Sequence, residues 1–457
     1  MMTLNLALRN LLRNRRRSLA TLLAMAIGST AILLFGGFSD NIKYEMHTRY
    51  VQRGGHLQIQ HRDFYLYGSG NPDAYAISNY AEILAAIRND PVLSSMLVVA
   101  TPTLQFGGIA GNYAASVSRT IVGTGLVATD INLMRRWNDF GLRSKAPASA
   151  LEGSAPDAAV VGTGLARVLQ LCDALKIDRC PQPELPQKHD GKTIPNDIAQ
   201  LSLQETPATA GTPASRPGRV EVLVANAKGA PNVTSVDVIR AEDQGIKELD
   251  EIALMMHLAK VQQLIYGHSP PKANSIMIQL RHSDQIPLAR ARLQTIVAGF
   301  SAVQPLAVLD FRQLNPFYVQ TTRMFDTIFG FVFILIGGIV LFTINNTMNT
   351  AVIERTVEIG TLRALGLRQA GIRRLFLTEG VLLVVCRALL GVVLALGLAA
   401  LVNQMDIPWV PPTTVEPVPL TILVWGETRM MLGTTVGLIC IAILSAWWPA
   451  RRAARLD

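Results

Sequence analysis

The chain has 457 residues, of which 49% are hydrophobic and only 16% are charged, and its formal net charge is +9. The charge content is low for an ordinary globular enzyme, while a mean hydropathy of +0.29 is too low for a protein made only of membrane spans. The positive charge would suit nucleic acid, but arginines cluster beside apolar runs near both ends of the chain. That pattern is typical of membrane topology, so we expect no nucleic-acid partner.

Four apolar windows are long enough to cross a bilayer. A hydrocarbon core of about 30 Å takes roughly 20 helical residues at about 1.5 Å each. The windows predict four transmembrane helices at residues 19–38, 327–344, 381–401 and 430–450. The first window is longer than the apolar part of a signal peptide and has no small-residue cleavage site, so we expect it to be retained.

The basic residues predict the orientation of these helices. Arginines gather in residues 1–18, 345–380 and 451–457, whereas the loop 402–429 has one arginine against three acidic residues. Positive charge favours the cytoplasmic side. Both termini and the linker 345–380 are therefore predicted to be cytoplasmic, and the loop 402–429 and the insert 39–326 extracytoplasmic. An insert of that size is large enough for two subdomains.

The two ends of the insert show the same order of predicted elements. A strand at residues 56–60, an amphipathic helix from Tyr80 and a second strand at 97–106 follow one another, and residues 274–280, 286–296 and 304–311 repeat strand, helix and strand. We predict that these halves pair into one α+β subdomain at the membrane-proximal base. The residues between them would form a distal subdomain.

That middle section contains three further predictions. Residues 181–219 hold seven prolines among small polar residues and are predicted to be a flexible loop. Cys172 and Cys180, outside the spans and eight residues apart, are predicted to form a disulfide worth about 2–3 kcal/mol, although two unpaired thiols would also fit. Residues 249–263 have the spacing of an amphipathic helix.

Several possible cofactor sites are discounted. VGTGL occurs at 122–126 and at 161–165 without completing G-x-G-x-x-G, so glycine turns at strand ends explain it better. GKT at 191–193 lacks the upstream glycine of a Walker A motif. His56 and His61 would point to opposite faces of a strand, which argues against a shared metal. We therefore expect no catalytic residue, metal or cofactor in this chain.

The linker 345–380 carries the densest pattern of charges. Glu354 and Glu358 lie one helical turn apart, and Ile353, Val357 and Ala364 keep an apolar side at helical spacing. A short amphipathic helix here would suit docking into a groove of a cytoplasmic partner. The alternative is a solvated charged loop that only satisfies the positive-inside bias.

The run ERTVEIGTLRALGLRQAGIRRLFLTEG closely resembles the signature of the FtsX/MacB/LolC–LolE superfamily of ABC transporter permeases. Residues 1–18 resemble the family's cytoplasmic amphipathic helix, and GHLQIQ resembles the strand that opens the external domain in the lipoprotein-release, LolE-like branch. The resemblance implies a coupling helix that contacts an ATPase, formed by Glu354, Arg355, Glu358, Ile359, Gly360, Arg363, Ala364, Leu365 and Gly366.

The same resemblance implies the partners and the mechanism. A separate cytoplasmic ATPase would bind ATP and Mg, and two permease subunits, identical or different, would pair in the lipid of a bacterial inner membrane with the large domain in the periplasm. ATP-driven motion would pass to that domain by mechanotransmission and extract or export a lipoprotein or other amphipathic cargo. A periplasmic carrier or adaptor would be a further partner. Two alternatives stay open: MacB-like efflux with a periplasmic adaptor, and FtsX-like regulation of a cell-wall hydrolase.

Arg387 departs from the family pattern because it lies within the third predicted span. An arginine at the centre of a span costs about 2.5–3.5 kcal/mol on insertion scales. Its side chain is predicted to snorkel to the cytoplasmic interface. The alternative is an intramembrane ion pair of Glu379 with Arg387.

Overall fold

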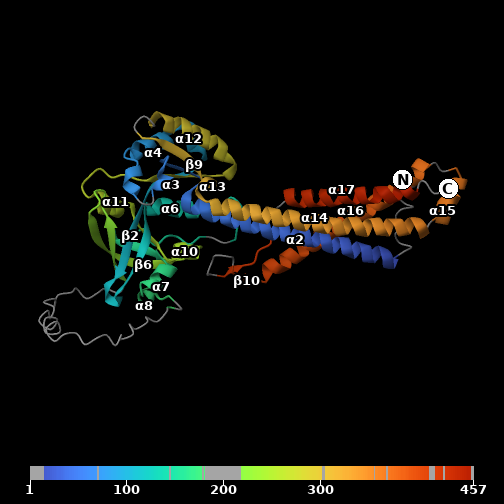
Figure 1. Cartoon of the computed structure of the whole chain (residues 1–457), viewed down its shortest axis with the longest axis horizontal. Helices are drawn as coiled ribbons and strands as arrows, with labels where there is room; N and C mark the ends of the chain where they lie inside the picture. The colour runs from blue at the N-terminus through green and yellow to red at the C-terminus, as the bar shows by residue number, and fades with distance from the viewer. Residues whose placement is uncertain are drawn as a thin grey trace, which may run out of the picture. The chain divides into compact units, whose positions relative to one another are not determined.

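The computed structural model describes residues 15–68, 71–143, 146–177, 180, 218–300, 304–354, 356–366, 369–410, 417–425 and 428–453 (Figure 1). The chain divides into two compact units. The helical unit comprises Met1–Met46, Pro316–Trp409 and Val418–Asp457, and the sheet unit comprises His47–Asn315 and Val410–Pro417. The predicted N-terminal helix lies outside the described residues, apart from its last four positions.

The described part of the helical unit contains four long helices and one short one, which Figure 1 shows. Each long helix contains one predicted span and extends beyond it, because a helix can continue into water after its apolar stretch has ended. Between α14 and α16, the described residues form one short helix. The helices are α2 (Arg15–Gly54), α14 (Pro316–Glu354), α15 (Thr356–Ala364), α16 (Gln369–Gln404) and α17 (Thr428–Ala453).

Helices α14 and α17 run parallel. A Cβ added at Gly437 would lie 2.8 Å from the Phe333 ring, and the Ser445 hydroxyl donates a 2.6 Å hydrogen bond to the carbonyl of Leu341. Both contacts join residues with the same separation in sequence, so the helices advance in the same direction. The absence of a side chain at Gly437 allows this close approach.

Helix α2 runs antiparallel to α14 and parallel to α16. From Gly28 to Phe35 along α2, the neighbouring residue on α14 moves back from Ile336 to Phe329. From Thr30 to Leu33, the neighbouring residue on α16 moves forward from Gly391 to Ala395. The long helices therefore alternate in direction along the chain. A polytopic membrane protein with four crossings requires that alternation.

One helix in the described part of the chain is long and apolar enough to cross a membrane, over Pro316–Asn346. The apolar stretches of the neighbouring helices are shorter, at Ala388–Gln404 and Met431–Ser445. The count of four spans thus remains a prediction. Between α16 and α17 lies a two-stranded ribbon, β10 (Pro408–Trp409) and β11 (Val418–Pro419).

The predicted pairing of the two ends of the insert is confirmed. Strands β9, β1, β8 and the first half of β2 form an antiparallel sheet in that order, which is the ferredoxin-like arrangement of a β-α-β-β-α-β unit. We call this part the base. Its elements are β1 (Leu57–His61), α4 (Tyr80–Asn89), α5 (Pro91–Met96), β2 (Leu97–Asn112), β8 (Ser275–Leu280), α12 (Ile286–Phe300) and β9 (Leu306–Asp310).

The base is held together by an apolar layer between its sheet and its helices. Ile59 on β1 pairs directly with Ile276 on one side and Val308 on the other, and all three are buried. Helices α4 and α12 contact each other as well as the strands. Short helices complete the base: α3 (Phe64–Tyr67), η1 (Pro72–Tyr75), η3 (Ser283–Gln285) and α13 (Phe311–Leu314).

The distal subdomain is a closed barrel of six strands. The second half of β2 pairs with both β3 and β5, and the remaining pairs β3–β7, β7–β4, β4–β6 and β6–β5 complete the ring. Closure removes free strand edges, which otherwise invite aggregation. The strands are β3 (Val117–Leu126), β4 (Ala158–Gly162), β5 (Arg219–Ala225), β6 (Pro231–Glu242) and β7 (Ala253–His257).

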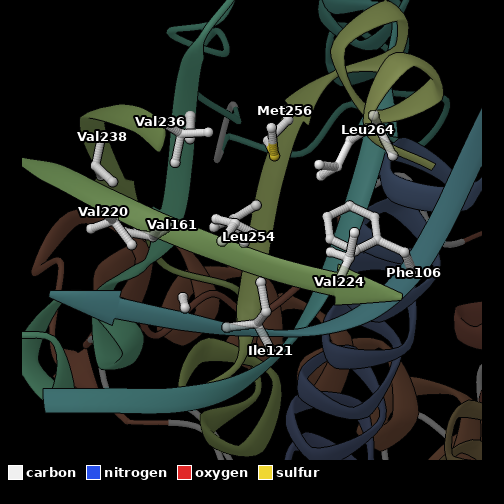
Figure 2. Close-up of a cluster of buried hydrophobic side chains, with 14 of the residues drawn as sticks. Phe106, Ile121, Val161, Val220, Val224, Val236, Val238, Leu254, Met256 and Leu264 are labelled. Carbon is white, nitrogen blue, oxygen red and sulfur yellow. The ribbon is translucent and has the colours of Figure 1, made fainter. Parts of the chain in front are cut away.

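Buried apolar side chains from all six strands converge inside this barrel (Figure 2). Phe106 on β2 lies directly opposite Gly123 on β3, where an added Cβ would come within 2.0 Å of its ring. Gly123 therefore makes room for the ring of Phe106. The accompanying helices are η2 (Tyr113–Ala115), α6 (Ala128–Arg135), α7 (Thr163–Val168), α8 (Cys172–Leu175), α10 (Lys247–Asp250) and α11 (Leu258–Tyr266).

The predicted helix over residues 249–263 is wrong. The structure has α10, then strand β7, then α11. Leu254 and Met256 alternate into the core while β7 pairs with β3 and β4, so tertiary pairing overrides the helical spacing.

The first VGTGL was predicted at a turn, but it lies within β3. Most of the predicted flexible loop lies outside the described residues, and its last residue, Arg219, already belongs to β5. Both differences arise because the residues belong to the barrel, whose closure depends on pairing that is remote in sequence.

Candidate functional site: the linker between α14 and α16

The predicted coupling segment forms a distinct helix between two long ones. Helix α14 ends at Glu354, α15 follows, and α16 begins at Gln369. The hydroxyl of Thr356 donates to the carbonyl of Ile353 at 2.8 Å, which supports the turn where α14 ends. Gly366 has a φ of +90°, a left-handed conformation that disfavours side chains, so the chain reverses there at little steric cost.

Large apolar side chains at this junction are unusually exposed. Ile353 is 72% exposed, Val357 is 83% exposed and Leu365 is 79% exposed. Ile353 lies at the end of α14, Val357 in the first turn of α15 and Leu365 directly after α15. Fully burying such a side chain contributes roughly 1.5–3 kcal/mol, so this surface, which we call the α15 patch, would gain considerably from a partner.

The remaining predicted coupling residues are only partly described. Gly360 and Ala364 are exposed positions of α15, and a Cβ at Gly360 would meet nothing within 4 Å. Glu354 is exposed at the end of α14. Arg355 lies outside the described residues, as do the side chains of three residues whose backbones belong to α15: Glu358, Ile359 and Arg363.

Two further pairs of residues were singled out by the sequence. Glu379 and Arg387 both lie in α16, but their side chains are outside the part of the chain that the structure describes, so the ion pair stays a prediction. Cys172 and Cys180 are joined by a disulfide, with their Cα atoms 6.2 Å apart.

Sequence reasoning missed a histidine cluster in the base of the sheet unit. The hydroxyl of Ser283 lies 3.0 Å from Nε2 of His47 and 3.2 Å from Nε2 of His56. The backbone N–H of Leu280 donates to Nδ1 of His56 at 3.0 Å, so the proton of the neutral ring sits on Nε2 and is donated to Ser283. Ser283 can then donate its own proton to His47.

Aromatic rings enclose this cluster. His47 stacks on Trp137 with centroids 6.0 Å apart and contacts Phe311 at 4.7 Å, and both histidines are almost fully buried. Burial lowers the pKa of His47 to about 4, helped by the charge of Arg312, and lowers the pKa of His56 to about 3, helped by His47. Both rings are therefore neutral near pH 7.

An exposed ion pair flanks the cluster. Asp139 lies 2.7 Å from Nδ1 of His282 and also accepts the backbone N–H of Ser283 at 3.0 Å. The hydrogen bond and charge of Asp139 raise the pKa of His282. No sequence motif indicated this arrangement, because its members come from segments that are far apart in the chain.

The second VGTGL, where β4 ends and α7 begins, is already filled by the protein itself. The carboxylate of Asp250 accepts the backbone N–H of Thr163 at 2.9 Å and of Gly164 at 2.6 Å. An internal carboxylate thus occupies the position where a phosphate would bind a helix start. Within the described residues, no group of three or more His, Cys, Asp or Glu side chains could hold a metal ion.

Comparison with known proteins identifies the helical unit. Residues 327–457 match the family described as FtsX-like permease C-terminal. The macrolide export ATP-binding/permease protein MacB of Acinetobacter baylyi is 26% identical over 227 residues, 49% of this chain and 31% of that protein. The pyoverdine export ATP-binding/permease protein PvdT of Pseudomonas savastanoi is 36% identical over 126 residues, 27% of this chain and 16% of that protein.

The matched segment is an FtsX-like permease domain. Over parts of its length, the chain is similar to ATP-binding/permease proteins of the MacB and PvdT type. It spans less than a third of the length of these curated relatives. Among solved structures, the periplasmic region of MacB from Actinobacillus actinomycetemcomitans is 12% identical with a TM-score of 0.31, covering 57% of this chain and 90% of that one. The extracellular domain of the transporter YknZ has a TM-score of 0.29 at 11% identity, covering 56% of this chain and 99% of that one.

Proposed function

We propose that this chain is the membrane subunit of an ABC transporter in which a separate ATPase drives movement of an extracytoplasmic domain. The chain itself is not catalytic, and ATP and Mg bind to the partner. The sheet unit is the extracytoplasmic part, the linker between α14 and α16 is cytoplasmic, and two permease subunits act together in the inner membrane. This division of labour assigns a purpose to the features of both units.

The α15 patch carries the proposal. Ile353 at the end of α14, Val357 in α15 and Leu365 directly after α15 are mostly exposed, in a segment where arginines and glutamates alternate in the sequence. An apolar surface with a charged surround suits a groove in a protein partner better than lipid, which does not match the charges. An ATPase whose groove closes on this helix would push or tilt the two long helices that hold it.

The alternating directions of the long helices support the topology. With both termini in the cytoplasm, α2 and α16 lead outward while α14 and α17 lead inward, which matches their antiparallel and parallel contacts. The disulfide of Cys172 with Cys180 fits an oxidising compartment for the sheet unit. Helices α2 and α14 each adjoin the division between the units, so they are the routes along which motion would pass.

The cargo we propose is a lipoprotein or another amphipathic molecule taken from the outer leaflet. A closed barrel on a ferredoxin-like base leaves a large surface for handling such a molecule outside the membrane. The second candidate is efflux with a periplasmic adaptor, which is favoured by the similarity to export proteins named for macrolides and pyoverdine.

The variant Val357→Asp tests the coupling role. A buried carboxylate in the partner's groove would be unpaired, so the variant should lose ATPase binding and stimulated hydrolysis while still inserting into the membrane. Co-purification with the proposed partner ATPase, followed by hydrolysis assays in nanodiscs, measures both. Val357→Leu is the matched control, because it keeps the apolar contact, and it should retain binding. Full ATPase binding by Val357→Asp would rule out the α15 patch as the docking site.

The variant Tyr113→Cys tests the orientation. Tyr113 is 75% exposed in the barrel, and an impermeant thiol reagent should label it in intact spheroplasts once Cys386 and Cys440 have been replaced by Ser. Labelling only after lysis would place the sheet unit in the cytoplasm and refute the topology.

A further inference from the structure

A groove opens between α14 and α17 at one end of their contact. Its volume is about 310 Å³, and it is lined by Phe329, Gly330, Phe333, Gly433 and Thr434. The lining is almost wholly apolar, so water gains few hydrogen bonds within it. The groove belongs entirely to the helical unit.

The groove forms because glycines leave space between α14 and α17 that side chains fill elsewhere along the contact. Farther along the same two helices, a Cβ at Gly337 would come within 2.9 Å of Ile441, and one at Gly437 within 2.8 Å of Phe333. At Gly330 and Gly433, by contrast, an added Cβ would meet nothing within 4 Å. The two helices are therefore tightly apposed toward their C-terminal ends and separated by a groove toward their N-terminal ends.

The depth of the groove follows from the predicted spans. Gly330 and Gly433 each lie three residues into a span, that is about 5 Å below its start at about 1.5 Å per residue. With the proposed topology, both spans start on the extracytoplasmic side. The groove therefore opens at the level of the upper acyl chains of the outer leaflet, since half of the hydrocarbon core measures about 15 Å.

A cation stands above the groove on the same side of α14. The exposed Arg323 lies seven residues before Gly330, which is two helical turns toward the water. The nearby Asp326 is paired with Lys43 at 3.0 Å, and Lys43 also contacts Asp40 at 2.6 Å, so the two carboxylates share one lysine. Arg323 is thus placed to bind an anion at the membrane surface.

We propose that the groove binds one acyl chain of an outer-leaflet phospholipid, with the phosphate held by Arg323. An apolar groove below a guanidinium matches the two ends of a phospholipid, and arginine binds phosphate oxygens with two parallel hydrogen bonds. A lipidated protein would supply the chain but not the phosphate. This inference rests on the membrane topology given under the proposed function.

Photocrosslinking in membranes tests the groove. The full-length protein, with its ATPase, is reconstituted in nanodiscs containing phosphatidylglycerol with a diazirine on one acyl chain, and the crosslinked peptides are mapped by mass spectrometry. Crosslinks should concentrate on residues 329–333 and 433–434. Gly330→Leu and Gly433→Leu should remove them by filling the groove, and Arg323→Gln should lower the yield about tenfold by removing a charge-assisted contact.

Gly338→Leu is the matched control, because Gly338 is exposed on α14 with open space around it but does not line the groove. It should leave the crosslinks unchanged. Equal labelling of the whole apolar surface, or crosslinks that survive both groove variants, would overturn the proposal. So would a disulfide between copies carrying Gly330→Cys and Gly433→Cys, because a second subunit would then cover the groove. Labelling of Tyr113→Cys in intact spheroplasts separates failure of the lipid site from failure of the topology.

Discussion

Acidification should destabilise the base of the sheet unit, because His47 and His56 are buried as neutral rings. In the unfolded chain both would titrate near 6.5, whereas burial lowers the pKa of His47 to about 4 and that of His56 to about 3. Below 6.5 the unfolded chain therefore binds more protons than the folded one. The stabilisation is fully present above 6.5 and is lost as the pH falls toward the folded pKa values.

The expected size follows from proton linkage. At about pH 5 the unfolded ring is almost fully charged and the folded ring is still neutral, so each histidine reduces the free energy of unfolding by about 2 kcal/mol. Together they remove about 4 kcal/mol, a large fraction of the stability of a typical domain. Exposed His282 acts in the opposite direction: Asp139 raises its pKa, and that contribution is present at low pH and is lost as the pH rises.

Hydrogen exchange provides the assay. Peptides from β1 and β8 are followed in the full-length protein at about pH 7.5 and about pH 5, with rates corrected for the intrinsic pH dependence of exchange. His47→Gln removes one titrating ring and should halve the loss of protection, and adding His56→Gln should nearly abolish it. An equal loss in the wild type and in the double variant would refute the reasoning, whatever the variants do to stability at neutral pH.

Three further predictions concern single contacts. Gly123→Ala should destabilise the barrel by about 1–3 kcal/mol in urea unfolding because its Cβ would collide with a core ring, whereas Gly107→Ala on the partner strand, with nothing within 4 Å, should not. Gly366→Ala should lower the stability of α15, measured by hydrogen exchange, by about 1–2 kcal/mol, because Gly366 has a φ of +90°. Gly360→Ala should instead raise that stability by up to about 1 kcal/mol. Equal effects of the two variants would contradict the backbone argument. Reduction of the disulfide at α8 should lower the stability of the barrel by about 2–3 kcal/mol, and an unchanged melting curve would show that it does not constrain the unfolded chain.

The fold could be predicted where the pattern of neighbouring residues specifies the secondary structure. The strands and helices at the two ends of the insert follow from periodicity, and their pairing across more than two hundred residues was inferred because both halves repeat one order of elements. The segment from Leu249 to Gln263 shows where this fails. Its spacing fits a helix, but β7 is a strand because β3 and β4 are available as pairing partners on either side.

The candidate site divides in the same way. The α15 helix is local, so the spacing of charged and apolar residues indicated it. The cluster around Ser283 could not be found from the sequence, because His47 lies 236 residues away and His56 lies 227 residues away. Only the ferredoxin-like base, by pairing β1 with β8, brings the three side chains together.

The sequence by itself determined that this protein has long apolar helices, a large insert after the first of them, and a charged linker of the FtsX/MacB type, because hydropathy, charge and helical spacing act over neighbouring residues. The tertiary structure alone decided that the distal strands close into a barrel, that two histidines share one hydroxyl, and that α14 and α17 part to leave a groove at Gly330 and Gly433. Each of these depends on the distance between residues that are remote in the chain, and that distance is set only when the whole unit has folded.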